Sequence, residues 1–190
     1  MVYKEFLKRI EKEPDTNGLV YTLEAGAICT WVIPFQLYRL DDKSVSIVKV
    51  PPTHVEERTG RVKRVSMIGK NAFRGNENIT DVLLSSNITR LSEGCFQGCK
   101  NLQRLALPKG IGKIYKDTFA GCDSLTDVYF EGTIDEWKEI KIESEERIFE
   151  FGDLIPGTPV QELLSDRLVH LSGNDSLLKA TIHFGCILPY

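Results

Sequence analysis

Three cysteines lie close together in the sequence and are the first residues to consider for chemistry. Cys95 and Cys99 are four residues apart, and Cys122 follows 23 residues after Cys99. Cysteine side chains at such positions can bind zinc or form a disulfide, but a zinc site ordinarily uses C-x-x-C or H-x-x-x-H spacing. Neither spacing occurs in the chain, so we expect no metal site.

The histidines and acidic residues do not form a second chemical constellation. His54, His170 and His183 are scattered, and a catalytic histidine needs a nucleophile or carboxylate partner that the sequence does not specify. The acidic segment 135–153 lacks the alternating pattern of a calcium loop, and no phosphate-binding or nucleophile-elbow motif is present. We therefore predict no catalytic residues, no cofactor and no enzyme activity.

The charge and hydropathy of the chain exclude two classes of partner. The 190 residues carry a net charge of −3 with an isoelectric point near 5.7, whereas general nucleic-acid binding needs a basic face. No apolar run approaches the roughly 18 residues of a membrane span. The N-terminal segment has no signal-peptide apolar region. We expect a cytoplasmic protein if Met1 is the natural start, and a cell-surface or secreted one if upstream sequence was removed.

A repeat of 23 residues explains the spacing of the cysteines. Segments that start at Ile68, Leu91 and Ile114 align without a gap, and seven columns of the alignment agree in residue type. The columns are Phe73, Phe96 and Phe119; Gly75, Gly98 and Gly121; Ile79, Leu102 and Leu125; Val82, Leu105 and Val128; Leu84, Leu107 and Phe130; Ile88, Ile111 and Ile134; and Ile68, Leu91, Ile114 and Trp137.

The spacing within each repeat predicts a stack of coils. Leu105 and Leu107 are two residues apart, which places both on one side of a short strand. Successive coils would lay such strands in parallel about 4.8 Å apart, so that equivalent residues form ladders and each coil buries its apolar edge against its neighbours. Glycine at position 98 and its equivalents predicts a turn with left-handed backbone.

The repeat register accounts for all three cysteines without any chemistry. Cys99 and Cys122 share a column with Asn76, where a buried side chain meets backbone groups of the turn. Cys95 occupies a small-residue column before the phenylalanine. We expect free, structural thiols, and a disulfide between Cys99 and Cys122 on stacked coils remains the alternative.

The repeat unit F-x-G-(C/N)-x-x-L-x-x-(V/L)-x-(L/F) resembles the BspA-like class of bacterial leucine-rich repeats. Segments 131–142 and 173–184 resemble the closing segments that are common in that family. The resemblance implies an α+β repeat fold, a short right-handed solenoid with a parallel sheet. It also implies interaction roles, often at cell surfaces.

Three regions of the chain are expected. Residues 1–65 form an N-terminal helix and a degenerate capping coil, residues 66–142 form three repeats, and residues 143–190 form an inserted helical segment and a closing strand. The first helix covers residues 1–14 and ends at a proline. Segment 158–171 begins with a capping box and predicts the inserted helix. The two helices carry apolar stripes formed by Tyr3, Phe6, Leu7 and Ile10, and by Val160, Leu164, Leu168 and Leu171.

The outward side chains of the strands form the candidate binding surface, which we call the strand face. It consists of a charged ladder and a neighbouring strip that includes leucine, tyrosine and histidine, an ordinary surface for recognition. We expect this face to be exposed. The alternative is that the N-terminal helix or residues 143–172 cover it. The ladder is Asp81, Arg104 and Asp127, and the strip is Leu83, Ala106, Tyr129 and His183.

These expectations lead to a functional hypothesis. The protein is predicted to be a non-catalytic binding module that holds a protein partner on the strand face. One alternative is a structural protein that self-assembles into a homo-oligomer through the inserted helix. Another alternative is a cell-surface adhesion or glycan-binding fragment. An enzyme would need convergent polar groups that the repeat columns do not supply.

Overall fold

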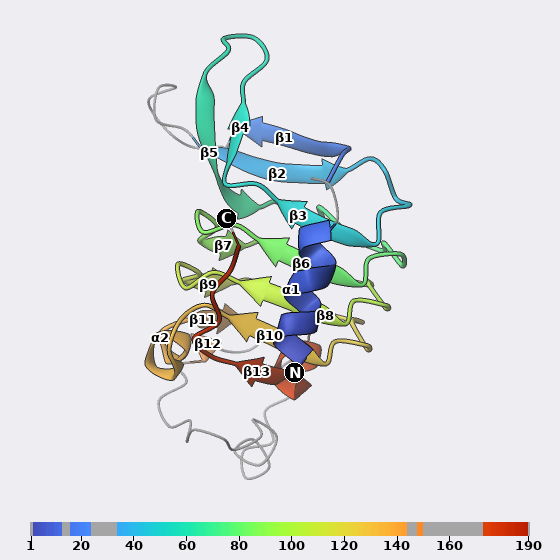
Figure 1. Cartoon of the computed structure of the whole chain (residues 1–190), viewed down its shortest axis with the longest axis vertical. Helices are drawn as coiled ribbons and strands as arrows, with labels where there is room; N and C mark the ends of the chain where they lie inside the picture. The colour runs from blue at the N-terminus through green and yellow to red at the C-terminus, as the bar shows by residue number, and fades with distance from the viewer. Residues whose placement is uncertain (1, 13–15, 24–33, 144–147, 150–172, 190) are drawn as a thin grey trace.

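The repeats stack along the long axis of the molecule, and each coil contributes one strand to a parallel sheet (Figure 1). The computed structural model describes residues 2–12, 16–23, 34–143, 148–149 and 173–189. Two sheets enclose an apolar interior, which we call the interior cluster. The parallel-sheet repeat fold expected from the sequence is confirmed, whereas the right-handed sense of the coils and the boundaries of the three regions remain predictions.

The first sheet contains five parallel strands in the order β13-β10-β8-β6-β3. Its register follows the sequence columns, because Leu105 pairs with Val82 on one side and with Val128 on the other. Val48 pairs with Val82, so the degenerate first coil stacks as predicted. The strands are β3 (Ile47–Val50), β6 (Asp81–Leu84), β8 (Arg104–Leu107), β10 (Asp127–Phe130) and β13 (Thr181–His183).

The second sheet runs in the order β1-β2-β5-β7-β9-β11-β12, with β4 paired to β5. Its central strands are parallel, and antiparallel pairs occur at β1–β2, β4–β5 and β11–β12. The strands are β1 (Leu19–Leu23), β2 (Phe35–Leu40), β4 (Thr53–Val55), β5 (Val62–Ile68), β7 (Arg90–Leu91), β9 (Lys113–Ile114), β11 (Lys141–Glu143) and β12 (Ile148–Phe149).

Phenylalanine rings form a stack through the interior cluster. The ring of Phe96 lies 5.0 Å from that of Phe73 and 5.6 Å from that of Phe119, and the planes are nearly parallel. The turn after each ring carries the predicted left-handed glycine, which has a φ of 75° at Gly98. A side chain at Gly98 would meet this backbone strain, so glycine is the residue that closes the coil.

The structure corrects one column of the repeat. Ile142, not Trp137, pairs with Ile114 in the second sheet. The cause is a short helix, α2 (Ile134–Lys138), which starts with a capping box between Thr133 and Glu136 and lengthens this coil. Trp137 lies on α2 and is buried in the interior cluster. It is apolar like the other residues of the column, but it does not occupy their position in the second sheet.

The cysteine column is structural. The thiol of Cys99 donates to the carbonyl oxygen of Phe73 at 3.2 Å, and the thiol of Cys122 donates to that of Phe96 at 3.1 Å. All four described cysteines, which include Cys95 and Cys186, are free and buried. The alternative of a Cys99–Cys122 disulfide is therefore wrong for this structure.

The buried thiols predict a loss of stability in alkali. Burial raises the pKa of Cys99 and of Cys122 to about 12, whereas an unfolded thiol ionises near pH 8.5. The pKa of each thiol is higher in the folded protein than in the unfolded chain. The contribution of the protonated thiol to the free energy of unfolding is therefore complete below about pH 8.5 and is lost as the pH rises toward about 12. We expect the free energy of unfolding to fall by about 1.4 kcal/mol per pH unit for each thiol in this window.

Urea denaturation between about pH 8 and about pH 11 measures this slope. Lysine and tyrosine side chains also titrate there, so the matched control is the double variant Cys99→Ala with Cys122→Ala. Its stability should decline less steeply than that of the natural protein. Equal slopes in the two proteins would contradict the prediction.

The C-terminal part of the described chain closes the stack. Helix α4 (Asp175–Lys179) leads into β13, which pairs with β10. The buried Asn174 side chain donates to the carbonyl oxygens of Tyr115 and Glu143 at 3.0 and 2.8 Å, and it accepts from the amide of Phe119 at 3.2 Å. These bonds satisfy backbone groups at the end of the solenoid. The inserted helix predicted at 158–171 lies outside the described residues.

Candidate functional site: the strand face

The structure brings the predicted residues of the strand face together in register. Leu83 pairs with Ala106, Ala106 pairs with Tyr129, and Tyr129 pairs with His183 across β6, β8, β10 and β13. Their side chains point to the side of the sheet opposite the interior cluster, as period two requires. The predicted strip is therefore continuous across four strands.

The expectation of exposure is wrong for three of the four residues of this strip, whereas His183 is partly exposed. Leu83 is 2% exposed, and Ala106 and Tyr129 are both fully buried. The helix α1 (Val2–Lys12) lies across the five-stranded sheet and covers them (Figure 1). The alternative that the N-terminal helix covers the strip is confirmed for Leu83, Ala106 and Tyr129.

A second apolar cluster, separate from the interior one, holds α1 on the sheet. We call it the face cluster. Phe6 and Ile10 are its anchors on α1, at 0% and 1% exposure, and Tyr3 and Leu7 pack beside them. These residues form the apolar stripe that the sequence predicted. The other buried members are Ile47, Leu83, Ala106, Tyr129, Cys186 and Leu188.

Tyr129 is the centre of the contact. Its ring centroid lies 4.6 Å from that of Phe6, 5.1 Å from that of Tyr3 and 5.0 Å from that of His183. Its hydroxyl is buried and finds no hydrogen-bond partner among the described residues. Burial, followed by the negative charge of Asp127, raises the pKa of Tyr129 to about 12. Within the described part of the chain, a neutral hydroxyl is thus buried under α1 without a hydrogen-bond partner, which is unfavourable.

The charged ladder forms one rim of the strand face. Asp81 has no exposed surface, and Arg104 binds it through two hydrogen bonds, the longer of which is 3.2 Å. Arg9 of α1 reaches the same carboxylate at 3.5 Å. Asp127 pairs with Nε2 of His183 at 2.8 Å. The hydroxyl of Thr80 also donates to Asp81 at 2.7 Å, and the helix that covers this face adds a second positive charge beside the buried carboxylate.

The contact between Asp127 and His183 could not be predicted from the sequence. Asp127 and His183 are 56 residues apart, and only the closing strand β13 brings them together. Cys186 is nearby, and its thiol donates to the carbonyl oxygen of His183 at 3.5 Å. Burial raises the pKa of Cys186, so this thiol is protonated at neutral pH and is a poor nucleophile.

Residues 184–189, which we call the C-terminal tail, complete the cover over the strand face. The amide of Cys186 donates to the carbonyl oxygen of Phe130 at 3.1 Å, and the hydroxyl of Tyr3 donates to the carbonyl oxygen of Ile187. Cys186 and Leu188 face the sheet while Ile187 is 82% exposed. Sequence reasoning missed this tail, although its alternation was a period-two signal.

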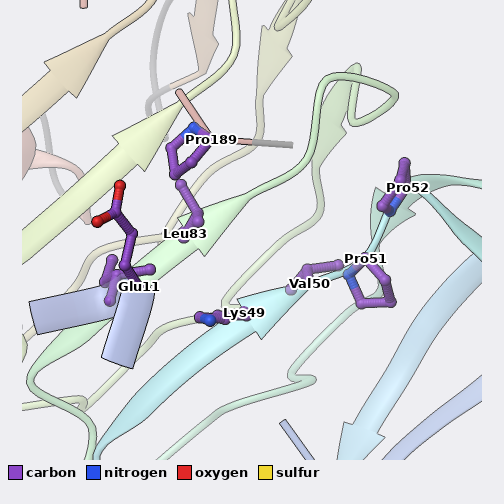
Figure 2. A pocket seen from close by; sticks show the side chains of 8 residues that line it. Glu11, Lys49, Val50, Pro51, Pro52, Leu83 and Pro189 are labelled. Atoms are coloured by element: carbon purple, nitrogen blue, oxygen red, sulfur yellow. The ribbon is translucent and has the colours of Figure 1, made fainter. Parts of the chain in front are cut away.

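A cavity of about 380 Å³ remains where α1 ends (Figure 2). The close-up shows side chains from four segments around it: α1, β3 with the two prolines that follow it, β6, and the C-terminal tail. The cavity adjoins Leu83 and its strand neighbour Lys49, at the β3 end of the strand face. Its lining residues are Ile10, Glu11, Lys49, Val50, Pro51, Pro52, Leu83 and Pro189.

Among the described residues, no group of three or more histidine, cysteine, aspartate or glutamate side chains is arranged to hold a metal ion. None of the helices in this part of the chain has the length and apolar character needed to cross a membrane.

Comparison with known proteins identifies the repeats. A sequence model of the family described as "BspA type Leucine rich repeat region (6 copies)" matches residues 61–147. A leucine-rich repeat protein from Bacteroides capillosus aligns with a TM-score of 0.53 and 23% identity, over 73% of this chain and 96% of that one. A leucine-rich repeat protein from T. pallidum aligns with a TM-score of 0.50 and 20% identity, over 68% of this chain.

The chain spans 59% of the T. pallidum protein, which is less than two thirds of its length. No curated protein matches the chain. At identities of 20% and 23%, the likeness to the two solved structures shows the fold alone.

Proposed function

Residues 61–147 are a leucine-rich-repeat region of the BspA type, and from this premise we propose that the protein is a non-catalytic module that binds another protein on its strand face. Repeats of this class commonly serve protein binding. In the proposed mechanism α1 occupies the strand face as an internal ligand, and the partner takes its place.

The observation that carries the proposal is the contact between α1 and the sheet. An amphipathic helix lays Phe6 and Ile10 into an apolar strip and sets Arg9 beside the buried Asp81. This is the helix-in-groove mode that many protein–protein complexes use. The face therefore has the shape, the apolar anchor sites and the charge that a helical ligand requires.

Release of α1 is compatible with an intact solenoid. The interior cluster contains no residue of α1, so the core of the repeats does not depend on the helix. A helix of 11 residues has little stability of its own and remains helical because it is docked. The buried hydroxyl of Tyr129, which has no hydrogen-bond partner among the described residues, lowers the net gain from docking. A partner with better contacts can therefore compete.

The test compares three full-length baits in affinity capture with quantitative mass spectrometry. The first is the natural chain, and the second is the variant Phe6→Asp with Ile10→Asp, which we call the α1-disabled variant. The third adds Leu83→Glu and Ala106→Glu to the second. We expect the α1-disabled variant to retain a partner at least about tenfold more strongly than the natural chain, and the third bait to lose it.

A matched control places the same charges elsewhere. Val55 and Val62 pair on the β4–β5 hairpin and are 50% and 65% exposed. Adding Val55→Glu and Val62→Glu to the α1-disabled variant should leave capture unchanged. If the bait with Leu83→Glu and Ala106→Glu retains the partner as strongly as the α1-disabled variant does, the binding surface lies elsewhere and the proposal is refuted.

Self-assembly and glycan binding remain separate hypotheses. The inserted helix that would drive self-assembly was predicted at 158–171, outside the described residues. The two alternatives for location, cytoplasmic or at the cell surface, also remain predictions.

A further inference from the structure

The described residues leave a space beside the last turn of α1. The helix ends at Lys12, and the cavity of about 380 Å³ opens beside Ile10 and Glu11 in its last turn (Figure 2). Leu83 contributes both to the face cluster and to the cavity, and its neighbour on β3, Lys49, also lines the cavity, so the cavity adjoins the end of the apolar strip. A helical ligand one turn longer would carry a side chain into this space.

The position of that side chain follows from helix geometry. Phe6 and Ile10 are four residues apart and lie on one face of the helix, so the next residue on this face comes three or four positions after Ile10. Three prolines and Leu83 give the cavity its apolar part, beside the charged side chains of Lys49 and Glu11, and this apolar part is where an apolar side chain would bind. A ligand with three anchors would bury more apolar surface than α1 does with two.

The charged rim requires a positive charge on the helical ligand. Asp81 is fully buried under α1 and receives Arg9, which immediately precedes the second anchor. A replacement helix without a cation at this position would leave the carboxylate with Arg104 alone among its described charged partners. The ligand is thereby specified in charge as well as in apolar pattern.

We propose that the partner of the strand face is an amphipathic helix with three apolar anchors at spacings of three or four, and a basic residue just before the second anchor. The first two anchors take the sites of Phe6 and Ile10, and the third enters the cavity beside Leu83. This inference rests on the proposed function. It adds that α1 is a shortened copy of the partner, which is why the partner displaces it.

The test uses synthetic helical peptides and the full-length α1-disabled variant. One labelled peptide carries residues 2–12 alone, and two others add either Ala-Leu-Ala-Ala or four alanines. The leucine falls four positions after Ile10, so only the second peptide can fill the cavity. Fluorescence anisotropy should show the leucine peptide binding about tenfold more tightly than the alanine peptide.

A second variant tests the location of the third anchor. Lys49 lines the cavity, and Lys49→Trp in the α1-disabled variant places a large ring there. This change should abolish the preference for leucine while leaving the affinity for the peptide of residues 2–12 unchanged. A preference that survives the substitution would mean that leucine binds elsewhere and would overturn the proposal. An Arg9→Glu peptide should bind at least about tenfold more weakly than its parent.

The outcomes separate the two proposals. If the α1-disabled variant is folded by thermal unfolding and binds none of the peptides, strand-face recognition itself fails. If it binds all three equally, recognition stands and the third anchor is rejected. Self-association of the α1-disabled variant that no peptide displaces would assign the face to a second copy of the chain and overturn the proposal of a separate helical partner.

Discussion

The α1-disabled variant is expected to release its N-terminal helix from the strand face while keeping the repeats folded. Phe6 and Ile10 are fully buried in the face cluster, and such burial stabilises by about 2 kcal/mol for each side chain. Aspartate removes this contribution and adds the cost of burying a charge. The equilibrium constant for docking should therefore fall by at least about a thousandfold.

Hydrogen exchange followed by mass spectrometry measures the release. Amides of residues 2–12 should lose protection, whereas those of residues 66–142 should keep it, because the interior cluster contains no residue of α1. The exposed strip should also bind an apolar fluorescent dye. The matched control is Lys4→Asp with Lys8→Asp, which puts two aspartates on the exposed face of the same helix. Persistent protection of α1 in the α1-disabled variant would contradict the prediction.

Replacement of Phe96 by alanine is expected to lower the free energy of unfolding by about 4 kcal/mol. The ring is fully buried between Phe73 and Phe119, at centroid distances of 5.0 and 5.6 Å, so its removal leaves a cavity in the middle of the stack. Because each coil is stabilised only by its neighbours, a defect in the central coil weakens the interfaces on both sides. Urea denaturation monitored by circular dichroism gives the change.

A comparison with Phe184→Ala separates stacking from general apolar loss. Phe184 is 38% exposed at the edge of the fold, where it contacts Phe130 and Trp137 edge-on. Its replacement should cost about 1 kcal/mol, because less surface is buried and solvent fills the space. Similar losses for the two variants would show that the phenylalanine stack is not the main source of stability.

Much of the fold was predictable because one repeat imposes one geometry. The columns that contain Phe96, Leu105 and Gly98 recur at 23 residues, and strand pairing then aligns every equivalent residue. The column of Cys99 and Cys122 was predictable for the same reason. Where the period breaks, prediction failed: α2 lengthens one coil, and Ile142 takes the place that Trp137 would have had.

The candidate site was predictable in composition but not in exposure. The residues that line up across β6, β8, β10 and β13 follow from the repeat, and so does the apolar stripe of α1. Nothing in either pattern says that the two surfaces meet. Docking depends on contacts between segments that are distant in the chain, such as Phe6 with Tyr129 and Arg9 with Asp81.

The sequence by itself determined the stack of coils, the parallel register and the structural role of the cysteines, because these depend on local period and on identical neighbours. Only the tertiary structure decided that α1 and the C-terminal tail cover the strand face, that Asp127 meets His183, and that a cavity remains beside Leu83. The physical reason is that burial of an apolar surface is non-directional. The apolar stripe of α1 and the apolar strip of the sheet can each be predicted from the sequence, but only the fold shows that they pack against each other.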